Sequence, residues 1–313
     1  MYVILGPTAT GKTHFASYLA NKINAEIISA DSRQVYRGMT IGTGKDYCDY
    51  IVDNQTIPCH LIDIVAPGYE YNIFEFKRDF TAAYKDITER GKEVILCGGS
   101  GMYIEAVLAD YRLDEVPKNI ILRNQLADRS DAELADMLLE IKGKTNKKLH
   151  NHTDLDTRER MLRAIEIETF FEEHDENEDK RVVPEAIIGL CAEREFVRQK
   201  ITKRLRARLE DEDMIGEVQK LLDSGVDSER LKRYGLEYKF ITMYVLGEIS
   251  YDTMFDRLNI AIHQFSKRQM TWFRRMEKKG FEIIWVDATL SDDEKIDFLA
   301  QNGLKFESQT SCS

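Results

Sequence analysis

Apolar residues follow two different rhythms in the first hundred positions of the chain. Residues 1–5 and 93–97 are mostly apolar runs that end at glycine, which is typical of buried strands. Residues 12–24 instead carry apolar side chains at helical spacing, and residues 26–30 form a further strand-like segment. Strands that alternate with helices predict a parallel sheet covered by helices on both faces, so we expect an α/β fold.

The pattern changes in the middle of the chain. Between residues 114 and 178 no strand-like run occurs, and helical spacing recurs in three segments, residues 122–126, 132–141 and 159–171. Strand-like segments return later, at residues 186–190 and 283–286, with a long basic helix beginning near residue 194.

These patterns predict the organisation of the chain. We expect an α/β core with C-terminal helices from residues 1–113 and 183–300, a small all-helical insertion domain at 114–182, and a flexible tail at 301–313. The acidic stretch at residues 172–179 is predicted to be a solvated loop.

Composition narrows the class of protein. The net charge of −11 and the pI of about 5.2 argue against general nucleic-acid binding, so any RNA contact must come from local patches. Five cysteines without a close pair favour reduced thiols and provide no zinc site. No apolar run approaches the roughly 20 residues that cross a bilayer. The chain also opens without a secretory signal pattern. We therefore expect a cytoplasmic protein without membrane contact.

A glycine-rich loop follows the first predicted strand. Residues 6–13, Gly-Pro-Thr-Ala-Thr-Gly-Lys-Thr, match the phosphate-loop pattern G-x-x-x-x-G-K-S/T between a strand and a helix. Backbone N–H groups of such a loop bind a polyphosphate, Lys12 adds positive charge, and Thr13 offers its hydroxyl to Mg²⁺. The pattern does not say which diphosphate is bound. The candidate diphosphate-binding residues are Gly6, Thr8, Ala9, Thr10, Gly11, Lys12 and Thr13.

A second polar motif, Ala-Asp-Ser-Arg-Gln-Val-Tyr at residues 30–36, follows the second predicted strand. Open α/β sheets bind ligands at that end of the strands, so the Asp31 carboxylate can reach the phosphate loop. It could hold Mg²⁺ through water or accept a proton from a nucleophile. A simpler alternative is that Asp31 only caps the next turn. Residues 36–45 add glycines and cations suited to gripping a phosphate or a nucleic-acid backbone.

Together these motifs resemble the tRNA dimethylallyltransferase family, also called tRNA isopentenyltransferases or IPP transferases, which has adenylate isopentenyltransferases as relatives. Further segments extend the similarity over most of the chain. They are G-G-S-G-M-Y at residues 98–103, P-C-H-L-I-D at 58–63, R-M-L-R-A-I-E at 160–166 and F-S-K-R-Q-M-T-W-F-R at 265–274.

The resemblance implies a reaction and a fold. A dimethylallyl group would pass from dimethylallyl diphosphate to the exocyclic N6 amine of the adenosine 3′-adjacent to the anticodon of a tRNA, with release of diphosphate. Mg²⁺ would be the cofactor, the core would resemble that of P-loop NTPases, and the protein would be a monomer. The helical insertion at residues 114–182 would contact the RNA.

The resemblance also assigns roles to individual residues. Asp31 would be the general base on the adenine amine, while Lys12 and Arg204 would stabilise the departing diphosphate. The implied RNA contacts are Asp31, Ser32, Arg33, Gln34, Ser100, Arg123, Glu159, Arg160 and Arg163. Two basic stretches, residues 194–208 and 267–279, suit a polyanionic partner, and we add Lys267 and Arg268 to the candidate RNA contacts.

The chain departs from the family pattern in two places, and both bear on which RNA is bound more than on the prenyl transfer. Residues 234–240, Tyr-Gly-Leu-Glu-Tyr-Lys-Phe, replace a G-Y-K-E segment, and the stretch between residues 166 and 182 is short. Three alternatives remain at this point: prenyl transfer to free AMP, ADP or ATP, a phosphate-loop kinase or nucleotide switch, and a catalytically silent RNA-binding protein.

Overall fold

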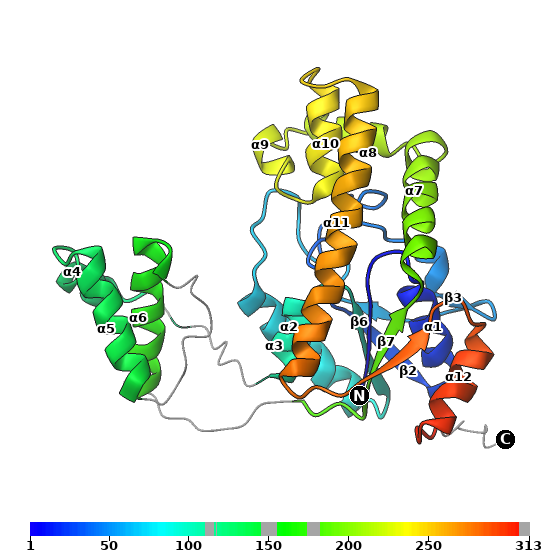
Figure 1. Cartoon of the computed structure of the whole chain (residues 1–313), viewed down its shortest axis with the longest axis horizontal. Helices are drawn as coiled ribbons and strands as arrows, with labels where there is room; N and C mark the ends of the chain where they lie inside the picture. Colours follow the sequence, from blue (N-terminus) through cyan, green and yellow to red (C-terminus); the bar gives the residue numbers. More distant parts are fainter. Residues whose placement is uncertain (110–115, 117, 145–154, 174–181, 307–313) are drawn as a thin grey trace. The chain divides into compact units, whose positions relative to one another are not determined.

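The computed structural model describes residues 1–109, 116, 118–144, 155–173 and 182–306. The chain forms two compact units (Figure 1). The larger unit comprises Met1–Tyr111 and Arg181–Ser313, and the smaller unit is Arg112–Lys180. In the described parts of both units, no helix is long and apolar enough to cross a membrane.

A six-stranded parallel sheet forms the centre of the larger unit, with the strand order β5-β2-β6-β1-β7-β8. The strands are β1 (Tyr2–Leu5), β2 (Ala25–Ser29), β5 (Cys59–His60), β6 (Glu93–Gly98), β7 (Ala186–Cys191) and β8 (Ile283–Asp287). All four residues of β1 are buried, which explains why its sequence is continuously apolar instead of alternating. The predicted parallel α/β sheet is confirmed. A short antiparallel hairpin, β3 (Ile51–Val52) with β4 (Gln55–Thr56), lies outside it.

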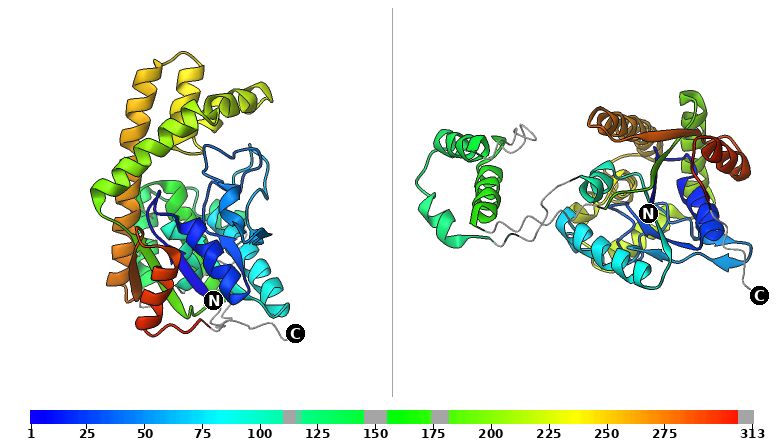
Figure 2. Two further views of the ribbon diagram at one scale, coloured as in Figure 1. Left: turned by 90° about the vertical axis from the view of Figure 1, so that its right-hand side faces the viewer. Right: turned by 90° about the horizontal axis from the view of Figure 1, so that it is seen from below.

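Helices cover both faces of the sheet (Figure 2). On one face, α1 (Lys12–Ile23) and α12 (Asp292–Gln301) contribute Phe15 and Leu299 to a core with Ile4 and Ile27. On the other face lie α2 (Ile73–Glu89), α3 (Gly101–Leu108) and the C-terminal part of α11 (Tyr251–Lys278). These two apolar layers give the larger unit the three-layer arrangement expected of a doubly covered parallel sheet.

A bundle of helices forms a third apolar cluster in the larger unit. It contains α7 (Arg194–Glu210), α8 (Met214–Asp223), α9 (Ser228–Leu231), α10 (Leu236–Val245) and the N-terminal part of α11. Val35 and Met39, from the segment after β2, are fully buried in this cluster. The 28-residue helix α11 therefore contributes to both the bundle and the sheet core, as Figure 1 shows. A single turn of 3-10 helix, η1 (Tyr47–Tyr50), precedes the hairpin.

The smaller unit consists of α4 (Ile120–Gln125), α5 (Asp131–Lys144) and α6 (Arg158–Glu173) in its described part. Its core is apolar, with Leu134 and Leu138 of α5 fully buried against residues of α6. The three segments with helical spacing are thus helices. Residues 174–179 of the acidic stretch lie outside the described residues.

The chain continues to pack on the core beyond residue 301. Leu304 and Phe306 contact the apolar cluster beneath α1, and the Phe306 ring lies 5.9 Å from that of Tyr2. The predicted tail therefore begins with a segment, residues 302–306, in which two apolar side chains are partly covered by the core. Residues 307–313, including Cys312, lie outside the described residues, and the four described cysteines are free.

The end of β6 leaves no room for a side chain at Gly98, where a Cβ atom would lie 2.2 Å from the Ala30 carbonyl oxygen. We expect Gly98→Ala to lower the free energy of unfolding by about 1–3 kcal/mol, because the backbone at Ala30 must shift to make room for the added methyl group. Chemical denaturation measures this change. Gly143→Ala is the control, since its Cβ would meet nothing within 4 Å. An unchanged unfolding midpoint for Gly98→Ala would contradict this packing.

Candidate active site

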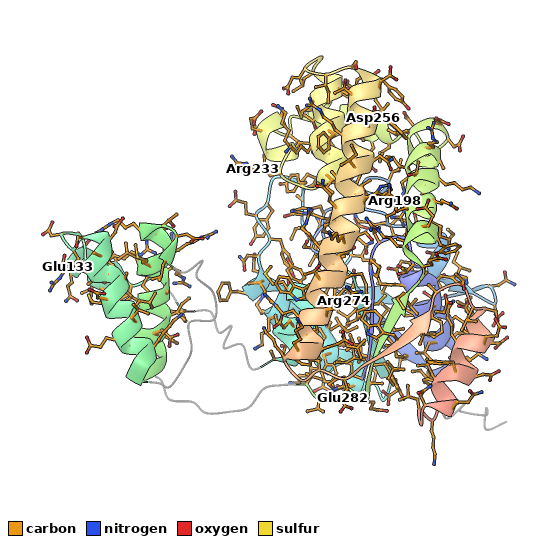
Figure 3. All side chains as sticks on the ribbon, in the orientation of Figure 1. Glu133, Arg198, Arg233, Asp256, Arg274 and Glu282 are labelled. Carbon is orange, nitrogen blue, oxygen red and sulfur yellow. The ribbon has the colours of Figure 1, made fainter. Side chains whose placement is uncertain are left out.

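A cavity of about 720 Å³ opens at the carboxyl ends of β1, β2 and β6 in the larger unit. The phosphate loop, the segment after β2 and the loop after β6 form one side of it, and residues of α7, α10 and α11 form the other. Arg233, labelled in Figure 3, belongs to the bundle side of the lining. This is the edge at which parallel α/β sheets bind their ligands.

The phosphate loop joins β1 to the first turn of α1. Gly11 adopts a left-handed conformation, with φ of 76°, directly before the helix begins at Lys12. The Lys12 ammonium folds back to donate to the Pro7 carbonyl at 2.7 Å. Of the predicted diphosphate-binding residues, Thr8, Gly11, Lys12 and Thr13 line the cavity. The others shape the loop behind this wall; they are Gly6, Ala9 and Thr10.

A glutamine from α11 connects two of the loops around the cavity. The side-chain carbonyl of Gln269 accepts a hydrogen bond from the Thr8 N–H at 2.8 Å, and its amide donates to the Gly99 carbonyl at 3.0 Å. Gln269 is buried. It lies within the 265–274 segment, but the sequence alone did not identify it as a site residue.

Three cations face the same region of the cavity. The Arg204 guanidinium donates to the Thr8 hydroxyl at 2.6 Å, and Arg208 lies one turn further along α7. Burial lowers the pKa of Lys12 to about 8 and that of Arg204 to about 10, the second cause for Arg204 being the positive charge of Arg208. Arg208 is paired with Asp46 at 3.0 Å. Half-buried Lys12 and Arg204 and buried Arg208, beside a phosphate loop, favour a multiply charged anion.

The Asp31 motif lines the same cavity as these cations. One carboxyl oxygen of Asp31 accepts a hydrogen bond from the Arg33 N–H at 2.8 Å, so Asp31 does cap the next turn while it borders the cavity. The Ser32 N–H donates to the Ser100 hydroxyl at 3.2 Å. Six predicted RNA contacts thus surround one cavity: Asp31, Ser32, Arg33, Gln34, Ser100 and Arg268.

The remaining predicted RNA contacts lie elsewhere. Lys267 is exposed on α11 and does not line the cavity. The other four belong to the smaller unit; they are Arg123, Glu159, Arg160 and Arg163. Within that unit Arg123 pairs with the buried carboxylate of Glu166 at 2.6 Å and with Glu159 at 2.8 Å. Arg163 also contacts Glu166, at 3.2 Å.

Sequence reasoning missed several residues of the cavity wall, among them Arg208, Glu237 and Trp272. Burial raises the pKa of the Glu237 carboxyl, and the nearby charges of Arg208 and Arg204 oppose that shift. A signal existed for two of these residues. Arg208 follows Arg204 at the four-residue spacing of one helix face, and Glu237 lies in the segment that departs from the G-Y-K-E pattern.

The donors around the cavity suit a metal that is held mainly by its substrate. Among the described residues, no group of three or more His, Cys, Asp or Glu side chains could hold a metal ion. Mg²⁺ commonly keeps several waters and binds through one or two protein oxygens together with phosphate oxygens. Thr13, at the first turn of α1 in the cavity wall, is placed to supply such an oxygen.

The fold and the cavity define a class of protein, an α/β phosphate-loop protein with a cavity at the carboxyl edge of a parallel sheet. The IPP transferase family model matches residues 34–276. A "tRNA dimethylallyltransferase 2" from Phocaeicola vulgatus is 55% identical over 300 residues, covering 95% of both chains. A "tRNA dimethylallyltransferase 1" from Parabacteroides distasonis is 54% identical, again with 95% of each chain covered. The protein therefore belongs to the IPP transferase family, as predicted.

Solved structures agree with this assignment. The tRNA isopentenylpyrophosphate transferase of Bacillus halodurans is 31% identical, with a TM-score of 0.67 over 96% of this chain and 95% of that one. A eukaryotic dimethylallyltransferase acting on tRNA shares the fold, with a TM-score of 0.77 at 22% identity over 98% of this chain and 81% of that one.

The lowered pKa of Lys12 gives a testable pH dependence. Because burial disfavours the ammonium, Lys12 is charged below a pH of about 8 and loses its charge above it. Affinity for dimethylallyl diphosphate, measured by calorimetry without RNA, should therefore fall by up to about tenfold per pH unit above that value. Lys12→Met should bind weakly with a flat profile. An affinity in the unchanged protein that is constant from about pH 7 to about pH 9 would contradict the shift.

Proposed function

We propose that this protein is a tRNA dimethylallyltransferase, which transfers the dimethylallyl group of dimethylallyl diphosphate to the N6 amine of the adenosine 3′-adjacent to the anticodon. One observation carries the proposal: a phosphate loop with its neighbouring cations and the carboxyl group of Asp31 line the same cavity. The loop and the cations suit a diphosphate, and the Asp31 carboxylate can receive a proton from an attacking amine.

The chemistry assigns a role to each side of the cavity. The allylic C–O bond breaks with its electron pair going to the diphosphate, and the N6–C bond forms. Lys12 and Arg204 stabilise the negative charge that develops on the diphosphate oxygens. Asp31 accepts the proton that the amine loses, because the adenine amine is a poor nucleophile and a positioned base contributes about 10²–10⁴-fold.

Mg²⁺ is the proposed cofactor, with Thr13 as its protein ligand. When bound, the ion neutralises charge on the diphosphate. The remaining neutralisation comes from the chain itself, through the loop N–H groups, Lys12 and Arg204.

The RNA is proposed to reach Asp31 with its target base unstacked, which is least costly in a single-stranded loop. Ser32, Arg33, Gln34 and Ser100 line the cavity beside Asp31 and are the proposed contacts to that nucleotide. Further contacts to the RNA are proposed from Arg268 and Lys267 and, in the smaller unit, from Arg123, Glu159, Arg160 and Arg163. We also propose that the protein is a cytoplasmic monomer, as the family resemblance implies.

The relatives named above favour the tRNA substrate over free adenine nucleotides. The test is incubation of the protein, Mg²⁺ and dimethylallyl diphosphate with either an anticodon stem-loop or AMP, followed by mass spectrometry. We expect the stem-loop alone to gain one dimethylallyl group. Modification of AMP alone would replace the proposal by adenylate isopentenyl transfer, and no gain on either would reject prenyl transfer.

A further inference from the structure

One wall of the cavity is a loop whose carbonyl groups hold Gln34. Gly42, Thr43 and Gly44 of this loop line the cavity. The Gln34 amide donates to the Gly44 carbonyl at 3.1 Å and to that of Thr43 at 3.5 Å, while its side-chain carbonyl accepts from the Ser29 hydroxyl at 3.1 Å. Gln34 is buried apart from its face on the cavity. Its orientation therefore depends on where this loop lies.

The loop is held in turn by a carboxylate from the helical bundle. Glu217 of α8 accepts hydrogen bonds from the N–H groups of Thr40 and Ile41 at 2.8 Å each, and from that of Gly42 at 3.1 Å. Successive backbone N–H groups that point the same way form a site for an anion, and here the anion is a side chain of the same protein. Hydrogen bonds to a carboxylate are roughly twice as strong as neutral ones, so this contact fixes the loop firmly.

A tyrosine supports the same carboxylate. The Tyr238 hydroxyl donates to Glu217 at 2.6 Å, and burial raises the pKa of Tyr238, which keeps the phenol protonated as a donor. The Tyr238 ring packs so closely on the loop that a Cβ atom at Gly42 would lie 2.7 Å from it. Glu217 does not line the cavity itself. Its effect on any ligand must pass through the loop.

We propose that Glu217 is a positioning residue for RNA, which fixes Gln34 against the target nucleotide by holding the loop at residues 40–44. The inference rests on the proposed function, because Gln34 is one of the proposed contacts to the adenosine. None of the hydrogen bonds of Glu217 involves the phosphate loop, so its main effect is expected through Gln34, although a Cβ atom at Gly44 of the same loop would lie 3.0 Å from Arg208.

A double-mutant cycle between Glu217 and Gln34 tests this role. We expect Glu217→Gln to lower kcat/KM for an anticodon stem-loop by about tenfold, because an amide cannot accept three N–H groups as a carboxylate does. The affinity for dimethylallyl diphosphate should stay within about twofold. In a Gln34→Ala background the further loss caused by Glu217→Gln should disappear, since residues that act through one another are not additive.

Glu212→Gln, at an exposed acidic position before α8, is the matched control and should behave as the unchanged protein. An equal loss from Glu217→Gln in both backgrounds, or a matching loss of diphosphate affinity, would overturn the inference. If Glu217→Gln does not fold, Tyr238→Phe removes one donor to the carboxylate and should show a smaller loss, about threefold, with the same dependence on Gln34. A failure of the unchanged protein to modify the stem-loop would instead reject the proposed function.

Discussion

The active-site geometry depends on one buried carboxamide. Gln269 accepts from the phosphate loop at Thr8 and donates to the loop after β6 at Gly99, so a single side chain sets the spacing of two loops from two neighbouring strands. A Cβ atom at Gly99 would lie 2.4 Å from the Gln269 amide nitrogen, which explains why the smallest residue occurs there. Because Gln269 belongs to α11, this contact also ties the sheet to the helix that contributes to the bundle.

The helical bundle can therefore place side chains of α7 at defined positions in the cavity wall. Arg204 reaches the Thr8 hydroxyl from α7, and Arg208 on the same helix pairs with Asp46. Burial makes the charged forms of Lys12 and Arg204 less favourable, as their lowered pKa values indicate. A bound diphosphate would compensate the positive charges of these two side chains. The burial that disfavours the cations when they are unpaired would therefore strengthen their interaction with a bound anion.

Much of this architecture could be predicted from the sequence because it is local. The apolar runs of β1 and β6, the helical spacing of α1 and the phosphate-loop pattern each occupy a few consecutive residues. Parallel strands end at one edge of the sheet, which brings Asp31 to the same edge as the phosphate loop. The strand order, in which β6 lies between β1 and β2, could not be predicted in this way. The two-residue strand β5 is too short to give a pattern of its own.

Contacts between distant residues could not be predicted in the same way. Glu217 accepts hydrogen bonds from the N–H groups of residues 40–42, which lie more than 170 positions earlier in the sequence. No local pattern relates the two segments. The role of Gln269 and the place of Glu237 in the cavity wall likewise depend on how the bundle packs on the sheet. The packing of residues 302–306 could not be predicted either, because Leu304 and Phe306 are isolated apolar residues whose partial burial depends on the finished core.

The central claim of the proposed function is that Asp31 accepts the proton in the same cavity in which the phosphate loop receives the diphosphate. The most direct test is the single-turnover rate of Asp31→Ala on an anticodon stem-loop, measured together with its affinities for the RNA and for dimethylallyl diphosphate. We predict a rate lower by about 10²-fold or more with both affinities nearly unchanged. A near-normal rate would contradict the claim.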